Sequence, residues 1–203
     1  MSQWLRAVAD YYSRAVREHG ATARGSDWKS DEAQLERFEA LALLFDRERP
    51  EVLDYGCGWG AFRGFLRERF ASFSYTGFDI STDMLETARQ LDPSVRLVSE
   101  LPAGEQWDFV VASGLFNVRL EASDEQWERH LFDTLHEFDR RARVGFAFNA
   151  LTSYSDADRR ANHLYYADPC RLADYCIRNF SRRVVLLHGR PAWDFAILVS
   201  KQA

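Results

Sequence analysis

This chain of 203 residues lacks the features that mark membrane, secreted and repetitive proteins. No apolar run approaches the ~20 residues that span a bilayer. The first stretch, MSQWLRAVADYYSRAVREHG, interrupts its apolar positions with charges and builds no signal-peptide core. No internal repeat or low-complexity tract stands out. We therefore expect a cytoplasmic protein that does not act on membranes.

Cysteine is also scarce. Cys57, Cys170 and Cys176 are too few and too scattered for a disulfide framework or a closed zinc site. We predict no metal site and expect the three thiols to stay reduced.

Excess positive charge is missing as well, because 26 Lys and Arg face 31 Asp and Glu, for a net charge of −5. The arginine clusters at 140–143 and 182–183 lie beside acids or at element ends, which is typical of solvated surface. Nucleic acid is therefore a disfavoured partner. Apolar residues make up 46% and charged residues 28%, and the length suits one α/β domain.

The order of the predicted elements indicates a parallel sheet. Two helices, 3–19 and 31–45, come first, separated by the polar segment GATARGSDWKS, which reads as a mobile connection. Strands and helices then alternate, which favours helices on both faces of a sheet. The strands are predicted at 51–55, 74–79, 95–99, 107–112 and 143–149. The helices are predicted at 62–70, 82–90 and 124–140, with another beginning at Asp168 and Pro169.

The last two strands, 184–188 and 193–200, are joined by GRPA, which is too short for a helical crossover, so they must pair antiparallel. The fold class is thus predicted as a three-layer, Rossmann-like α/β sandwich. Its seven-stranded, mostly parallel sheet closes with an antiparallel C-terminal hairpin. We expect one domain, with residues 1–48 as a helical lid and 49–203 as the core.

The stretch EVLDYGCGWGAF places Gly56, Gly58 and Gly60 directly after a strand that contains Asp54. Glycine tolerates positive φ and lets a ligand approach the backbone, so this turn is typical of a nucleotide site. A tight turn with close helix packing is the alternative interpretation. Asp79, in YTGFDIS, closes the next strand, where a carboxylate commonly binds both hydroxyls of a ribose. It could instead cap the helix that follows Ser81.

Three motifs together resemble a known family. LDYGCGWGAF, YTGFDISTDMLETAR and WDFVVASGLFNV are similar to the successive motifs of the class I methyltransferases that use S-adenosylmethionine (SAM). The resemblance covers about residues 51–201. The N-terminal segments resemble those of small methyltransferases of sugar and polysaccharide biosynthesis.

The resemblance implies a cofactor site for SAM, whose product is S-adenosylhomocysteine (SAH). Asp79 would bind the ribose hydroxyls, and the glycine loop would contact the methionine and ribose. Tyr12 and Trp28 are candidates for a lid, since aromatic faces suit the sulfonium. The remaining implied contacts are Asp54, Gly56, Cys57, Gly58 and Gly60 at the loop, Ile80, Met84, Glu100 and Leu101 at the adenine, and Ser113, Gly114 and Phe116 at the methionine end. Packing in the core or at the surface is the other interpretation for several of them.

A NAD(P)-dependent oxidoreductase is the competing family. Gly56, Gly58 and Ala61 satisfy the G-x-G-x-x-G/A spacing, and Asp79 would serve that ribose equally well. The glycine at 60, the acid ahead of the loop and the closing hairpin count against it.

The sequence offers few candidates for catalysis. A base is needed only if the acceptor keeps its proton at neutral pH, as a hydroxyl does. His163 lies in a long segment typical of a lid or binding loop, and Tyr166 could wall the acceptor pocket. Asn117 and Asn149 are predicted to end the fourth and fifth strands and to point into the cleft. Each also has a structural interpretation, which we prefer outright for His130, His136 and His188.

These features predict transfer of a methyl group from SAM to oxygen or nitrogen of a small polar metabolite, with a sugar or nucleotide-sugar first. The enzyme is expected to be a monomer or homodimer. A catalytically silent SAM-binding subunit is the alternative from another functional class.

Overall fold

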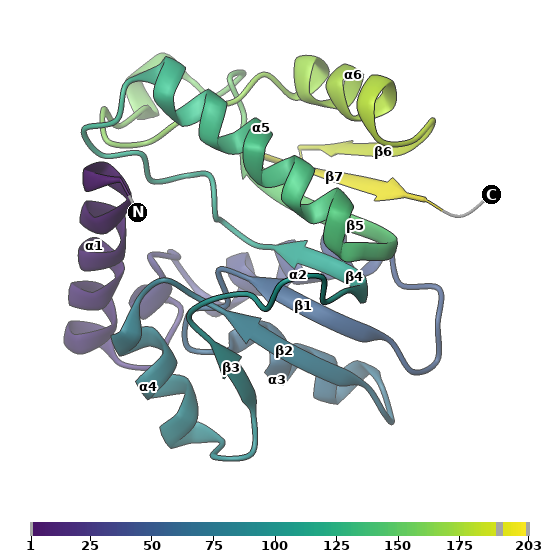
Figure 1. Ribbon diagram of the computed structural model, residues 1–203. Coiled ribbons are helices and arrows are strands. Elements are labelled where there is room, and N and C mark those ends of the chain that lie inside the picture. Colours follow the sequence, from purple (N-terminus) through teal and green to yellow (C-terminus); the bar gives the residue numbers. More distant parts are fainter. Residues whose placement is uncertain (1, 190–192, 202–203) are drawn as a thin grey trace.

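The computed structural model describes residues 2–189 and 193–201, which form one sheet with helices on both faces (Figure 1). The strands of this described part are β1 Glu51–Tyr55, β2 Ser74–Phe78, β3 Arg96–Val98, β4 Trp107–Ala112, β5 Ala142–Leu151, β6 Arg183–His188 and β7 Asp194–Ser200. The helices are α1 Gln3–His19, α2 Asp31–Ala42, α3 Ala61–Arg69, α4 Thr82–Leu91, α5 Asp124–Arg141 and α6 Pro169–Asn179, with short 3-10 turns η1 Arg24–Ser26 and η2 Ala157–Arg159.

The seven strands of the described sheet run in the order β3-β2-β1-β4-β5-β7-β6. β1 to β5 pair in parallel, and β7 is antiparallel to both β5 and β6. The predicted sheet and its closing hairpin are confirmed, although most of the GRPA connection lies outside the described residues. The strand order reverses between β1 and β4, and ligands bind at such a switch point in open α/β sheets.

Packing divides the helices between the two faces of the sheet. α5 and α6 cover one face, where Leu131, Phe138 and Cys176 join the largest buried cluster. α2 and α3 cover the other face, with Phe38 and Phe62 in its core (Figure 1). Within the described chain, none of the helices is both long and apolar enough to cross a membrane.

Two predictions for the N-terminal part need correction. α2 ends at Ala42 and not near Phe45, because Phe45 packs inward with its ring centroid 4.7 Å from that of Phe109. The connection between α1 and α2 was expected to be mobile, but it contains η1 and packs closely against α1. A Cβ on Gly25 would lie 2.0 Å from the carbonyl oxygen of Gly20.

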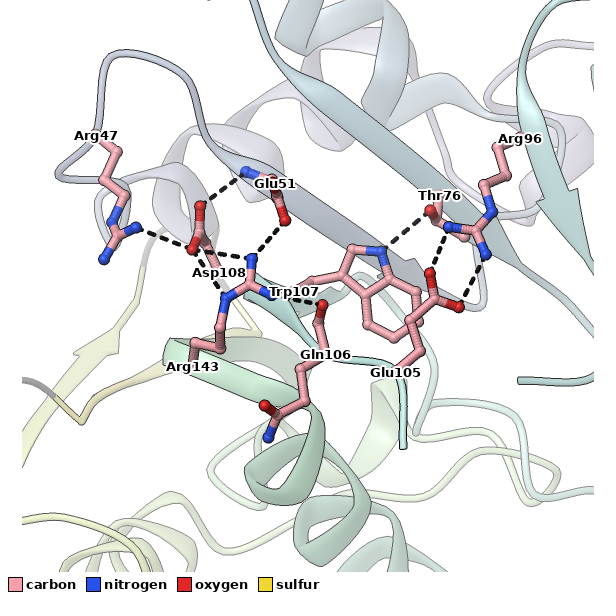
Figure 2. A network of polar contacts seen from close by, with 9 residues as sticks. All are labelled: Arg47, Glu51, Thr76, Arg96, Glu105, Gln106, Trp107, Asp108 and Arg143. Carbon is pink, nitrogen blue, oxygen red and sulfur yellow. Dashed lines mark hydrogen bonds and ion pairs between the residues drawn. The ribbon is translucent and has the colours of Figure 1, made fainter. Parts of the chain in front are cut away.

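A polar network joins the starts of β1, β4 and β5 (Figure 2). It lies at the amino ends of these strands, away from their carboxyl ends, where ligands bind. Asp108 accepts hydrogen bonds from Arg47 Nη1 at 3.0 Å, Arg143 Nε at 3.3 Å and the Glu51 amide at 3.2 Å. Arg143 also pairs with the Glu51 carboxylate. These contacts fix the strand starts relative to one another and leave the carboxyl ends open for a site.

Candidate functional site

A cavity of about 620 Å³ lies at the carboxyl ends of β1, β2 and β4. Its size falls within the range of small-molecule sites. α1, the η1 segment and the first turns of α2 contribute one wall, and the loop after β4 and α5 contribute another. The switch point of the sheet therefore coincides with this cavity.

The turn after β1 is left-handed at each of its glycines, with φ of 79° at Gly56, 54° at Gly58 and 89° at Gly60. The Gly56 and Cys57 amides donate to the Phe78 carbonyl at 2.7 and 2.9 Å, which ties the turn to the end of β2. A Cβ on Gly56 would also lie 2.8 Å from Leu115 Cδ1. Positive φ and close approach together explain glycine in this turn.

Asp79 lies between this turn and α4. Its Oδ2 accepts from the Gly58 amide and its Oδ1 from the Ser81 amide, both at 2.8 Å. Ser81, whose hydroxyl accepts from the Met84 amide at 3.2 Å, supplies the side-chain cap of α4. Burial raises the pKa of Asp79, and its backbone hydrogen bonds oppose that rise. Each carboxylate oxygen keeps a second lone pair that can accept from a ligand hydroxyl.

Asp54 is 2% exposed and lines the cavity from the end of β1. Its Oδ2 accepts from the Tyr75 hydroxyl at 2.7 Å, where the sequence led us to expect the loop amides nearby. Burial raises the pKa of Asp54 to about 7, against the effect of the Tyr75 hydrogen bond. Asp54 is therefore partly protonated near neutral pH.

Trp28 covers the loop after β4, because a Cβ on Gly114 would lie 2.6 Å from Trp28 Cζ2. The Arg37 guanidinium lies 4.3 Å from the centroid of the Trp28 ring and pairs with Asp194, which is 1% exposed. No pattern in the sequence indicates this pair, since Arg37 and Asp194 come from opposite ends of the chain.

Polar groups with unused hydrogen-bonding capacity collect where β4 ends. Asn149 Oδ1 accepts from the Gly114 amide at 2.8 Å, and Asn117 Oδ1 accepts from the Leu151 amide at 3.2 Å. Among the described residues, the buried Ser113 Oγ and Asn149 Nδ2 have no hydrogen-bond partner. An unpaired buried polar atom is costly, so these atoms suit a polar ligand.

Both asparagines differ from the predicted placement at strand ends. β5 continues past Asn149 to Leu151, and Asn117 lies in the loop beyond the end of β4. The two hydrogen bonds nevertheless link the loop after β4 to the end of β5, since Asn149 accepts from Gly114 and Asn117 accepts from Leu151.

The cavity brings together most of the residues predicted for the cofactor, and one predicted for catalysis. The predicted residues that line it are Tyr12, Trp28, Asp54, Gly56, Cys57, Gly58, Asp79, Ile80, Met84, Ser113, Gly114 and Asn117.

The other predicted cofactor residues lie outside the lining. Gly60 caps the start of α3, and Phe116 is completely buried in the core. Glu100 is exposed beyond β3, and Leu101 packs against the largest core cluster. Phe116 differs from expectation because its ring packs against Phe138 and Phe148.

The remaining candidates for catalysis are also away from the lining. Tyr166 is half-buried, and its hydroxyl accepts from the Ala161 amide at 3.0 Å. His163 is exposed, with its ring centroid 6.4 Å from that of Tyr11. His130, which we interpreted as structural, does line the cavity. The described residues hold no group of three His, Cys, Asp or Glu arranged for a metal ion.

Comparison with known proteins gives consistent results. Residues 52–138 match a family model described as "Methyltransferase domain". The chain is 42% identical over 153 residues to "Putative methyltransferase Rv1506c" of Mycobacterium tuberculosis, which covers 74% of this chain and 92% of the relative.

Two solved structures share the fold. Magnesium protoporphyrin IX methyltransferase of Synechocystis with bound SAH superposes with a TM-score of 0.71 at 15% identity, over 98% of this chain and 100% of that one. A Burkholderia thailandensis 1,6-didemethyltoxoflavin N1-methyltransferase, bound to that compound and SAH, gives 0.63 at 17% identity, over 100% and 92%.

Proposed function

The chain belongs to the class I methyltransferases that use SAM, and from this we propose that it methylates oxygen or nitrogen of a small polar metabolite. One observation carries the proposal. Asp79 meets the left-handed glycine turn at the wall of a cavity placed at the switch point of the sheet. That arrangement fits a nucleoside whose ribose hydroxyls donate to a carboxylate.

The residues of the cavity fit SAM as a whole. Asp79 would hold the ribose, the turn at residues 56–60 would contact the ribose and methionine, and Ile80 and Met84 would lie on the adenine. Ser113 Oγ, buried and unpartnered among the described residues, would bind the polar methionine end with Gly114. Glu100, Leu101 and Phe116 remain candidate contacts that would require local adjustment.

Bound SAM supplies a methyl group that its sulfonium already activates, so the protein must mainly align the reactants and exclude water. Trp28 on Gly114, together with α1, covers the cavity, in agreement with residues 1–48 as a lid. Asn117 and Asn149 would donate hydrogen bonds to a polar acceptor. His163 and Tyr166 remain predicted contributors from the segment between β5 and α6.

A sugar or nucleotide-sugar stays our first choice of acceptor. Trp28, Trp127 and Trp193 are among the residues that line the cavity, and tryptophan combines a large apolar surface with one polar N–H group, which suits a ring that carries hydroxyls. The magnesium protoporphyrin IX and 1,6-didemethyltoxoflavin enzymes are named for small-molecule acceptors.

Calorimetry with SAM, SAH and NAD, followed by a search for products 14 daltons heavier, tests this function. We expect SAM and SAH to bind and NAD not to bind. Incubation with SAM and a panel of sugars, nucleotide-sugars, phenols and amines should then give one methylated product. Binding of SAM without any product would favour the catalytically silent subunit, and binding of NAD alone would favour the oxidoreductase.

A further inference from the structure

His130 is the one histidine that lines the cavity within the described residues. It lies on α5 and is half-buried. Its ring centroid is 5.1 Å from that of Trp4 on α1 and 5.4 Å from that of Trp127 on α5. Trp4 and Trp127 also contact each other at 5.5 Å. Two large rings from two helices therefore restrict the orientation of the imidazole.

The nitrogens of this ring are not committed to the protein. Across the described chain, His130 makes no hydrogen bond with another residue. His136 Nε2, on the same helix, lies 2.9 Å from the Tyr175 hydroxyl, and His188 Nε2 lies 2.9 Å from Thr152 Oγ1. His136 and His188 each have a hydroxyl partner within hydrogen-bond distance, whereas His130 has none among the described residues.

The surroundings favour a neutral ring before the reaction and tolerate a charged ring after it. Burial lowers the pKa of His130, so the imidazole is unprotonated at neutral pH. Asp133, further along α5, is the charged group that acts on it in the described part of the chain, and it opposes the lowering. Trp4 and Trp127 pack against the ring and do not titrate.

The cavity that His130 lines also has apolar residues from α1 and from the segments that follow β4 and β5. α1 contributes Leu5 and Val8, and the loops after β4 and β5 contribute Val118 and Leu164. Such apolar lining limits the water that can compete with an acceptor group for the base. The acceptor end of the cavity and the base would then coincide.

We propose that His130 is the general base of the methyl transfer and that the acceptor group is therefore a hydroxyl. The inference rests on the proposed function. The acceptor O–H bond breaks and its proton moves to a ring nitrogen of His130. The oxygen forms a bond to the methyl carbon while the carbon–sulfur bond of SAM breaks and its electron pair stays on sulfur. The imidazolium later releases the proton to solvent.

Histidine titration by NMR tests the placement without any acceptor. Protein with labelled histidines is titrated alone, with SAH and with SAM, and H130Q assigns the His130 signal. A sulfonium near the ring opposes protonation, so SAM should lower the pKa of His130 by roughly one relative to SAH. His136 should titrate identically in both complexes. Equal pKa values of His130 with SAM and SAH would overturn the proposal.

Steady-state kinetics with the hydroxyl compound that the enzyme methylates test the role of His130 as a base. H130Q should lower kcat by about 10² to 10⁴-fold, keep the KM for SAM and lose the acid limb of the pH profile. H136Q, matched on the same helix, should retain wild-type activity. Loss of activity in H163Q with full activity in H130Q would assign the base to the other histidine. If calorimetry detects no SAM binding, the proposed function itself fails and this inference with it.

Discussion

At the scale of single residues, Asp79 joins three segments of the chain: the end of β2, the glycine turn and the start of α4. Its carboxylate already accepts two backbone hydrogen bonds, from the amides of Gly58 and Ser81. A ribose would add charge-assisted hydrogen bonds on the remaining lone pairs. The residue thus has a structural role, and we propose that it also binds the ribose.

Asp79→Ala should weaken SAM binding by several fold to a hundredfold, because one or two charge-assisted hydrogen bonds are lost. Calorimetry measures the change. Asp92→Ala is the matched control, since Asp92 pairs with Arg63 and Arg67 and does not line the cavity. SAM affinity that is unchanged in Asp79→Ala would remove Asp79 from the site.

Asp54 predicts a pH dependence. Its pKa of about 7 lies above the ordinary value, so in the free protein its contribution to stability is present at low pH and is lost as pH rises through 7. A cationic ligand favours the ionised carboxylate, so SAM affinity should rise between pH 5.5 and 8, by up to about tenfold per pH unit below 7. Calorimetry should show a flatter profile for Asp54→Asn. An identical profile in that variant would exclude Asp54 as the titrating group.

The sequence predicts residue pairs well only where motifs order them along the chain. Asp79 and the glycine turn follow consecutive strands, and parallel strands end at the same edge. Arg37 and Asp194 pair across the chain, and His130 of α5 lines the cavity beside Trp4 of α1. Such contacts depend on how helices dock, and neither spacing nor residue type indicates them.

At the scale of elements, the N-terminal segment meets the core at Gly114. Gly114 follows β4 at φ 73°, and Trp28 packs where its side chain would be. Gly104 has the same φ, and a Cβ there would meet nothing within 4 Å. Substitutions at the two glycines therefore distinguish the effect of backbone strain from the effect of displacing Trp28.

Gly114→Ala should weaken SAM binding about tenfold, because the new methyl group displaces Trp28. Gly104→Ala should keep full affinity while it loses about 1 kcal/mol of stability to the left-handed backbone. Calorimetry and thermal unfolding of the two variants give both quantities. Equal affinities would mean that Trp28 does not cover the cofactor.

The network at the strand starts predicts a change in stability alone. Asp108→Asn should lower the free energy of unfolding by roughly 1–3 kcal/mol, because Arg47 and Arg143 lose a buried carboxylate. Glu105→Gln breaks a more exposed pair with Arg96 and should cost below about 1 kcal/mol. Denaturant titration measures both variants. A loss of SAM affinity in Asp108→Asn would contradict the separation of this network from the site.

Element boundaries were predicted to within a residue or two where caps and turn residues mark them, as Ser123 does for α5. They were wrong where tertiary packing decides. Phe45 leaves helix α2 for the core, and β5 extends to Leu151 because β7 pairs with it along that length. Packing of aromatic rings and pairing of distant strands override local preference at these ends.

At the scale of the whole molecule, the N-terminal helices and the sheet line one cavity together. α1 is attached to α4 by Arg17, which bonds both oxygens of Asp83 at 2.7 and 2.8 Å, and by the Ser13 and Ser81 hydroxyls, 2.8 Å apart. The first helix is therefore attached to the helix that begins just after Asp79. Cofactor binding and lid position should respond to one another.

A crystal structure of the protein with SAH tests the central claim most directly. We predict electron density in the cavity, with the ribose hydroxyls within hydrogen-bond distance of Asp79 and the homocysteine beside the turn at residues 56–60. Density for SAH at any other place, with this cavity free of it, would contradict the account.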